Sequence, residues 1–591
     1  MNLPTRAAGR AAVALVLGVA VAGCVSLPDS SSVSAGSGVA VSEEENQIVF
    51  SPRGPVSGAS RQEIADGYLK AMLAFPRAPD TVRQFLTPAG GDAWEPDAQT
   101  LVYESRNIAE GKAGAVALQL QALGSIDARG SWDSADPTDD ILDMRFVFQR
   151  VGGQWRIDNP ATGTLLDADF FDRYYQQFSL YFFDPAHTLL TPDPVFLLLG
   201  DTGQTATTLV RDLLLGPTVS LGGVVVAEVP LTTRVEPRVT VTASGLAEVP
   251  LTRQVLALTP TDLKRFAAQL TWTLRQEGLG ITHVRMTSGG QVVRIPGQGD
   301  SFSVDAFQGY DPTIFAASRR LYALSDGHLV AVTSSQPSVV AGKIGALARK
   351  ATYAAIDPTV ARAALVVNNA TKVVVGNISV GDDTSGNEVW FEGGHDLRKP
   401  SWDVHGLLWL VDQTPEDGAV VRVVTGSAAR VVEAPGISGY DVEAFAVSRD
   451  GSRLAAVIGH GPSTRIVIAM IDRSPVSRIN VSVIGTRVVV NAQFPLASLT
   501  QLTWFSSTSV AVLAQDEGSD TQPYEIAIDG SRVQPTTGFL PVRPISLAAA
   551  ANIEVPEIIG TQDGRLYTRT PDQQWEPLTI RNKLFAPVYA G

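Results

Sequence analysis

The sequence predicts a multidomain protein in which an α+β N-terminal half is followed by an all-β propeller. Three observations predict this class. A chain of 591 residues is long enough for three or four domains. Apolar residues at helical spacing alternate with strand-like stretches in the first half of the chain. From residue 310 onward the sequence holds only short strands bounded by tight turns, and they recur at the spacing of propeller blades.

The chain begins with the pattern of an export signal. Arg6 and Arg10 precede an unbroken run of Ala, Val, Leu and Gly over residues 11–22, which is too short for a stable membrane-spanning helix. Val21-Ala22-Gly23-Cys24 follows at once and resembles the bacterial lipobox, whose cysteine sulfur receives a diacylglycerol before the signal is cut. We therefore expect residues 1–23 to be a lipoprotein signal peptide and Cys24, the single cysteine of the chain, to be lipidated. The alternative is an ordinary secretory signal with an unrelated cysteine.

Residues 24–55 are predicted to form a flexible tether, because Ser, Gly and acidic residues predominate and apolar residues show no period. A diacylglycerol carries two acyl chains, which together anchor a protein stably to a membrane. Residues 1–23 contain two arginines and no acidic residue, so cleavage changes the formal net charge from −14 to −16. A chain this acidic has no general attraction for nucleic acid or for anionic lipid headgroups.

Residues 56–187 are predicted to form an α+β domain. Ser60 and Glu63 make a capping box, and apolar residues then recur at helical spacing until Pro76 and Pro79 end the helix. These apolar residues are Ile64, Tyr68, Met72 and Phe75. Further on, two alternating strands meet at Gly152-Gly153, which predicts a hairpin. A helix followed by curved strands and a "GGQWRI" hairpin resembles the NTF2-like cone.

Aromatic residues are concentrated near the end of this domain. Trp155 and the Tyr/Phe cluster at residues 170–183 could line a ligand pocket. Aromatic side chains more often fill a hydrophobic core, and we predict that these do so.

Residues 190–300 are predicted to form a second α+β unit. "TATTLVRDLLLGP" indicates a short helix with three inward leucines, ended by Gly216-Pro217. A second helix begins at the capping residue Thr259 and closes at Gly278. Its apolar stripe consists of Leu263, Phe266, Ala267, Leu270 and Leu274. Valine-rich strands lie between the helices and "ITHVRM" follows, an order that resembles the GerMN domain of sporulation and germination lipoproteins. That resemblance implies an interaction module without a catalytic centre.

Residues 310–591 are predicted to form the propeller. A strand, a tight turn and a second strand recur in "LYALSDGHLVAV", "ALVVNNATKVVVGN", "PSWDVHGLLWLVD", "FAVSRDGSRLAAVI", "LTWFSSTSVAVLA" and "IIGTQDGRLYTRT". The turns contain Gly327, Gly406, Gly451, Gly564, Ser507-Thr508 and Asn368-Asn369. A β-sandwich with coincidental hairpins is the alternative, but five or six copies favour blades, which bury their apolar faces by stacking. Closure of such a ring would bring "RRLYALSDG" and "GRLYTRTPDQQWEPL" side by side.

The order of these parts resembles the actinobacterial LpqB lipoprotein family over the whole chain. The resemblance implies an S-diacylglycerol and an N-palmitoyl group on Cys24 and a position on the extracytoplasmic face of the cell membrane. It also implies an accessory role in envelope and cell-division control, through the extracytoplasmic domain of the sensor histidine kinase in the MtrA–MtrB two-component system.

An enzyme is the other class to consider. The six histidines are His187, His283, His328, His395, His405 and His460. None lies in an H-E-x-x-H pattern, and no G-x-S-x-G elbow occurs. His395 and His405 flank one propeller turn and could share a metal, but separate histidines are the commoner case. Acidic clusters at 133–140 and 381–388 could bind Ca²⁺, yet they lack the spacing of a known calcium loop.

We therefore predict a protein that is not an enzyme, with no catalytic residue, cofactor or metal site and with no nucleic-acid partner. The alternative function is a propeller that binds a ligand or hydrolyses cell-wall material. That alternative requires polar groups that converge in the propeller channel, whereas a regulator requires contact patches on the exterior.

Overall fold

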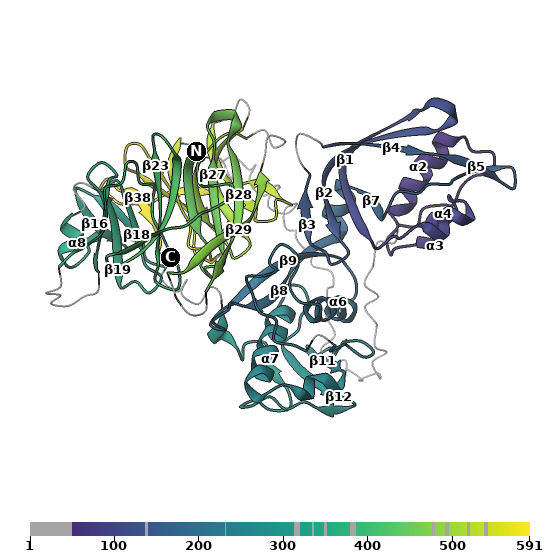
Figure 1. The fold of residues 1–591 in the computed structure, drawn as a ribbon, viewed down its shortest axis with the longest axis horizontal. Coiled ribbons are helices and arrows are strands. Elements are labelled where there is room, and N and C mark those ends of the chain that lie inside the picture. Colours follow the sequence, from purple (N-terminus) through teal and green to yellow (C-terminus); the bar gives the residue numbers. More distant parts are fainter. Residues whose placement is uncertain are drawn as a thin grey trace, which may run out of the picture. The chain divides into compact units, whose positions relative to one another are not determined.

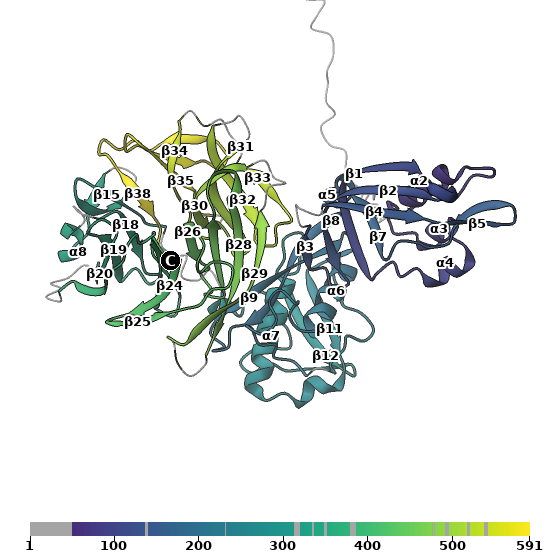
Figure 2. The same ribbon diagram turned by 45° about the horizontal axis from the view of Figure 1, so that its top comes forward.

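The computed structural model describes residues 50–591 apart from thirteen short internal segments. These segments are 136–139, 231, 312–318, 334–335, 348–350, 379–385, 475–476, 478, 491–495, 517–519, 537–539, 541 and 553. Residues 51–591 form one compact unit. Its N-terminal part mixes helices with strands, and its C-terminal part is built almost entirely from strands (Figures 1 and 2). The predicted order of an α+β half followed by a propeller is therefore confirmed.

The first α+β region begins with the predicted capped helix. The Ser60 hydroxyl accepts from the Glu63 amide, and the Glu63 carboxylate accepts from the Ser60 amide, so α2 starts at Arg61. The helices are α2 (Arg61–Met72), α3 (Pro79–Arg83), α4 (Pro88–Ala93) and α5 (Ala168–Tyr174). Helix α2 buries its apolar stripe against a mixed five-stranded sheet in the order β3-β2-β1-β7, with β4 also paired to β2 (Figure 1).

Two of the strands of this sheet, β1 and β2, have 12 residues each and the others are shorter. The strands of the sheet are β1 (Gln99–Glu110), β2 (Val116–Asp127), β3 (Trp132–Ser134), β4 (Ile141–Phe146) and β7 (Thr164–Asp167). The predicted hairpin is β5 (Phe148–Val151) and β6 (Gln154–Ile157), and both Gly152 and Gly153 have positive φ, which the tight turn requires. Most of the aromatic cluster at 170–183 is buried, as predicted. Trp155 is half-buried, with the guanidinium groups of Arg61 and Arg150 over its ring.

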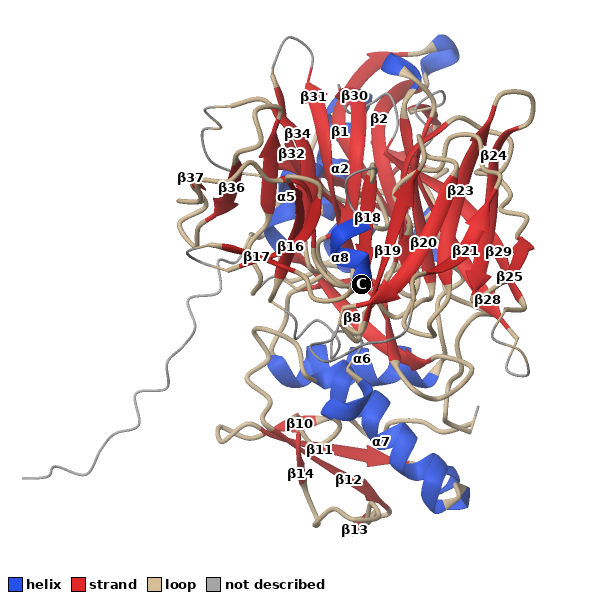
Figure 3. Ribbon diagram, turned by 90° about the vertical axis from the view of Figure 1, so that its left-hand side faces the viewer, coloured by secondary structure: helices blue, strands red, loops and turns tan. Residues whose placement is uncertain are grey.

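The second α+β region has two helices beside a small sheet (Figure 3). Helix α6 (Thr202–Leu214) buries Leu209, Leu213 and Leu214, as predicted. Helix α7 (Pro260–Leu274) starts where Thr259 caps it and is buried on nearly every side of its second half. The sheet contains β10 (Thr240–Val241), β11 (Leu246–Leu251), β12 (His283–Ser288), β13 (Gln291–Val292) and β14 (Phe302–Ser303).

A long hairpin packs against α7. Its strands are β8 (Tyr175–Phe183) and β9 (Leu190–Leu198), which pair over their whole length. The boundary predicted near residues 187–190 falls in the turn of this hairpin, where the Asp184 carboxylate accepts from the amides of Thr188 and Leu189. Phe178, Leu180 and Phe182 of β8 join the core around α6 and α7.

The C-terminal part is a propeller of six four-stranded antiparallel sheets. Blades two to six are sequential. Blade two contains β18 (Tyr353–Ile356), β19 (Arg362–Val367), β20 (Lys372–Asn377) and β21 (Glu388–Glu392), and blade three contains β22 (Ser401–Trp402), β23 (Leu408–Thr414), β24 (Gly418–Thr425) and β25 (Ala428–Val431). Blade four contains β26 (Val442–Val447), β27 (Arg453–Ile458), β28 (Arg465–Arg473) and β29 (Val481–Val490), and blade five contains β30 (Leu496–Trp504), β31 (Ser509–Asp516), β32 (Thr521–Ala527) and β33 (Val533–Pro535). Blade six contains β34 (Pro544–Ala548), β35 (Ile558–Thr561), β36 (Leu566–Arg569) and β37 (Trp575–Pro577).

Blade one closes the ring because it combines both ends of the propeller sequence. Strands β15 (Leu321–Ser325), β16 (His328–Val332) and β17 (Pro337–Val339) are completed by β38 (Phe585–Val588), which pairs with β15. Leu321 and Leu566 share one hydrophobic cluster, so the two segments predicted to be neighbours do lie together. The short helix α8 (Lys343–Ala346) lies between blades one and two in the sequence.

Candidate functional site

The propeller channel is a candidate functional site, because the innermost strands of all six described blades line it. Strands β38, β18, β22, β26, β30 and β34 each contribute lining residues. Most of these residues are apolar or small, such as Trp402, Phe445, Leu502 and Ala548. The cavity measures only about 30 Å³. It therefore has room for very few water molecules and no room for a cell-wall fragment.

Two cations lie beside this channel. Burial lowers the pKa of Lys399 to about 8 and that of Arg449 to about 10, because each cation is removed from bulk water. The Arg449 guanidinium donates to the Ala590 carbonyl oxygen, and the Gly591 amide donates to the Ile356 carbonyl oxygen at 2.9 Å. The backbone that follows β38 thus occupies the axis. The described polar side chains that line the channel are Lys399, Ser401, Thr503 and Tyr589. The Ser401 hydroxyl accepts from the Val447 amide, and the Tyr589 hydroxyl donates to the Pro556 carbonyl oxygen.

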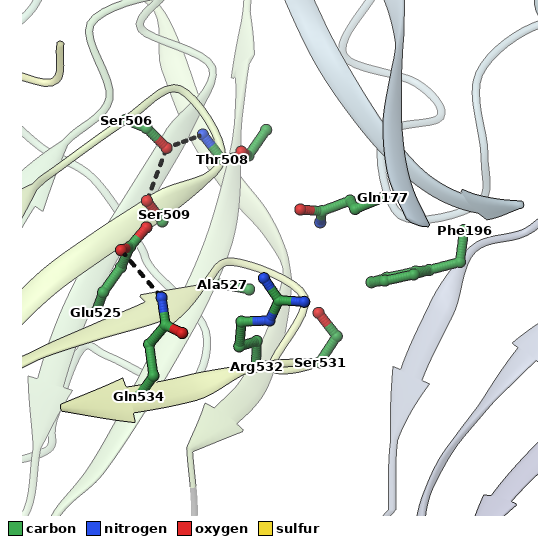
Figure 4. A pocket seen from close by; sticks show the side chains of 10 residues that line it. All are labelled: Gln177, Phe196, Ser506, Thr508, Ser509, Glu525, Ala527, Ser531, Arg532 and Gln534. Atoms are coloured by element: carbon green, nitrogen blue, oxygen red, sulfur yellow. Dashed lines mark hydrogen bonds between the residues drawn. The ribbon is translucent and has the colours of Figure 1, made fainter. Parts of the chain in front are cut away.

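A second cavity, of about 90 Å³, lies between the β8–β9 hairpin and blade five (Figure 4). The Ser506 and Ser509 hydroxyl groups lie 2.7 Å apart, and the Thr508 amide donates to Ser506 Oγ. Arg532 and Ser531 point toward Gln177 and Phe196 across the cavity (Figure 4).

The second cavity brings serine hydroxyl groups, the Glu525 carboxylate and the Arg532 guanidinium together. A serine nucleophile needs an adjacent base, and the described residues that line the cavity include no histidine or lysine. The Glu525 carboxylate accepts from the Gln534 side-chain amide (Figure 4). The arrangement suits ordered water or a small anion. No sequence signal predicts this site, since its residues come from segments more than 300 positions apart.

Each histidine considered as a metal ligand has its own local contacts. The His395 amide donates to the Asp412 carboxylate, whose other oxygen lies 3.6 Å from His395 Nδ1. The His405 amide donates to Asp403, a fully buried carboxylate that also accepts from Leu407 and from the Trp409 indole. Within the described part of the chain, no group of three or more His, Cys, Asp or Glu side chains could hold a metal ion.

The remaining predicted sites fall wholly or largely on residues that the structure leaves undescribed. Cys24 lies outside the described residues. Residues 136–139 and 381–385, which make up much of the two acidic clusters, lie outside them as well. Among the helices that are described, none has the length and apolar character needed to span a bilayer.

Comparison with known proteins identifies the family. Residues 54–172 match the family described as "Lipoprotein LpqB, N-terminal domain", and residues 327–590 match "Lipoprotein LpqB beta-propeller domain". Together these two matches cover more than half of the chain.

Relatives extend the similarity to nearly full length. A protein named Lipoprotein LpqB from Cutibacterium acnes is 26% identical over 591 residues, covering 96% of this chain and 97% of its own. Lipoprotein LpqB from Thermobifida fusca is 26% identical and covers 97% of both chains. Among solved structures, TolB from Acinetobacter baumannii is 15% identical, covers 56% of this chain and 86% of its own, and has a TM-score of 0.35. Because both family domains occur in order, the chain belongs to the LpqB lipoprotein family.

Proposed function

We propose that this protein is a lipid-anchored regulator that acts through protein contacts on the extracytoplasmic face of the cell membrane. Its partner is the extracytoplasmic domain of a sensor histidine kinase of the MtrB kind, and its lipid is carried by Cys24. The family supports the lipoprotein character. The proposal of a regulator rather than an enzyme is supported by the narrow propeller channel, whose cavity measures about 30 Å³ and is too small for an envelope polymer.

Anchoring explains how weak contacts would suffice. A short tether raises the effective concentration of the folded part near its partner to the millimolar range. A contact that is weak in solution is then occupied in the membrane, and no catalytic group is needed. The lipid is therefore part of the mechanism, since an unanchored chain loses the gain in local concentration.

The test compares two full-length chains in the native membrane. We expect the wild-type chain to change kinase autophosphorylation and Cys24→Ser to lose most of this effect, although both chains fold equally well. Mass spectrometry of the mature N-terminus should show the lipid on Cys24 of the wild-type chain. An equal effect of both chains, or hydrolysis of purified envelope material by the wild-type protein, would favour the alternative function.

The contacting region can be located with photo-crosslinking residues at exposed apolar positions. Ile141 reports on the first α+β region, Val219 on the second and Val431 on the propeller, and Val219 is 93% exposed. We expect the kinase to be captured from Val219 or Val431, since the GerMN-like region and the propeller exterior are the proposed contact surfaces. Capture from Ile141 alone would place the contact in the first region instead.

A further inference from the structure

A third cavity lies within the first α+β region, between α2, α3, the segment before β1 and the start of β7. It measures about 210 Å³. An apolar cavity of about 150 Å³ is large enough to hold benzene, so this one has room for a single ring with a short extension. Small-molecule sites are typically concave and apolar, with a few polar groups that fix orientation.

The inner walls are apolar and firmly held. Met72, Val82 and Trp94 are each at least 95% buried within the domain core. The Trp94 indole N–H donates to the Gly163 carbonyl oxygen at 2.8 Å, which fixes the ring and leaves no unsatisfied polar atom on this wall. The Leu165 amide lies 3.2 Å from Met72 Sδ, which fixes the end of that side chain. A ligand would thus enter a preformed site.

The guanidinium of Arg77 lies at the mouth of this cavity. The Arg77 Nη2 donates to the hydroxyl of Thr164 at 3.2 Å, and that hydroxyl donates in turn to the Pro96 carbonyl oxygen. Arg77 Nη1 lies 2.7 Å from the Asp97 carboxylate. The buried Thr164 thereby aims the guanidinium, while the Asp97 side chain is 83% exposed and contacts it from the solvent side. An ion pair so exposed is weak because water competes for both partners.

We propose that this cavity binds a small organic carboxylate, with its ring or short chain inside and its carboxylate on Arg77 in place of Asp97. The Asp97 side chain shows that a carboxylate fits at this guanidinium. A ligand whose carboxylate is joined to an apolar group also gains free energy when that group is buried in the cavity, and Asp97 does not. The inference does not rest on the proposed function.

The probe is 4-phenylbutyrate, titrated by calorimetry into the mature chain carrying Cys24→Ser, so that no attached lipid competes. The comparison compound is 4-phenylbutanol, which has the same apolar body without the charge. We expect measurable binding of the carboxylate and at least about tenfold weaker binding of the alcohol, the loss that follows when a charge-assisted contact is removed. Equal affinities, or no binding up to millimolar concentrations, would overturn the proposal.

Variants separate the charge from the cavity. Arg77→Gln should weaken 4-phenylbutyrate binding at least about tenfold, and Asp97→Asn should tighten it because the internal competitor is removed. Arg83→Gln is the matched control, since this exposed arginine lies 5.6 Å from the Trp94 ring and does not line the cavity. An equal loss in Arg83→Gln and Arg77→Gln would contradict a specific contact.

A further variant tests the cavity without touching the charge. Ala71 is a buried wall residue on α2, and Ala71→Leu places a larger apolar side chain in the space. We expect this change to abolish binding of 4-phenylbutyrate while circular dichroism stays unchanged. Binding that persists in Ala71→Leu would place the ligand elsewhere and refute the site. Should Arg77→Gln not fold, Arg77→Lys keeps the charge, loses the planar fork and should bind more weakly.

Discussion

Among single residues, two buried carboxyl groups make the stability of the fold depend on pH. Asp212 on α6 is 9% exposed, and burial raises its pKa to about 7 although Arg129 nearby acts in the opposite direction. Glu557 before β35 has its pKa raised by burial to about 7 as well, even though Arg569 donates to it at 3.0 Å. Between about pH 5 and pH 7, both carboxyl groups are protonated in the folded protein, whereas the same groups are ionised in the unfolded chain.

We predict that the free energy of unfolding falls as the pH rises from about 4 to about 7. In this window the folded state binds more protons than the unfolded state, so each pH unit costs stability. Asp212→Asn should remove up to about 4 kcal/mol of this decrease, at about 1.4 kcal/mol per pKa unit. Urea titrations at pH 4 and pH 8 measure this slope, and Glu557 accounts for the part of the decrease that remains in Asp212→Asn. An unchanged slope in Asp212→Asn would show that its carboxylate ionises normally.

At the scale of elements, closure of the propeller depends on one short strand. β38 is the innermost strand of blade one and pairs with β15, whose other edge pairs with β16. Val588 and Ala590 pack in the cluster between blades one and two, and Tyr589 packs in the cluster between blades six and one. The strand therefore joins three blades at once, and its loss would expose apolar surface on all of them.

Removing residues 585–591 should abolish cooperative unfolding of the propeller, because blade one then lacks its inner strand and the ring opens. Differential scanning calorimetry and limited proteolysis should show a lost transition and rapid cleavage. Phe585→Ala is the matched control, since Phe585 lies in the same strand but is 40% exposed, and it should leave the transition almost unchanged. A truncated chain with the wild-type transition would mean that five blades suffice.

Across the whole described chain, a shared hydrophobic cluster and several polar contacts join the α+β half to the propeller. Arg453 of β27 is almost fully buried and donates to the Pro192 carbonyl oxygen at 2.6 Å. Gln177 of β8 donates to the Asp529 carboxylate at 3.0 Å. Burial of a guanidinium is costly, so this contact holds only while Asp450 and the Pro192 carbonyl satisfy it.

Replacing Arg453 with methionine should weaken the joint, because it removes the hydrogen bond to Pro192 and leaves the shared hydrophobic cluster in place. We expect calorimetry to show a broader or split transition compared with that of the wild-type chain. Arg319→Met serves as the control, since Arg319 pairs with Glu554 on the surface and is 70% exposed. If Arg453→Met unfolds in the same single transition as the wild-type chain, the joint is held by other contacts.

The parts of the fold with local signals could be predicted from the sequence alone. The Ser60 capping box, the stripe on α7 and the turn at Asn368-Asn369 follow from neighbouring residues, because caps, helical spacing and positive φ are properties of a few consecutive positions. Six strand–turn–strand phrases predicted a propeller for the same reason. The order of these parts also predicted membership of the LpqB family.

Only the tertiary structure decided which strands share a blade and which residues share a cavity. In blades three to five, the recurring strand–turn–strand segment forms the first and second strands, counted from the channel. In blades one, two and six, it forms the second and third strands. The pattern of apolar and polar residues cannot distinguish the two cases. β38 contains a proline and carries no alternating signal, and it becomes a strand because β15 offers it an edge. Arg77, Trp94 and Thr164 meet through the packing of α2 against the sheet. Such contacts depend on chain reversals across the fold, and local periodicity holds no information about them.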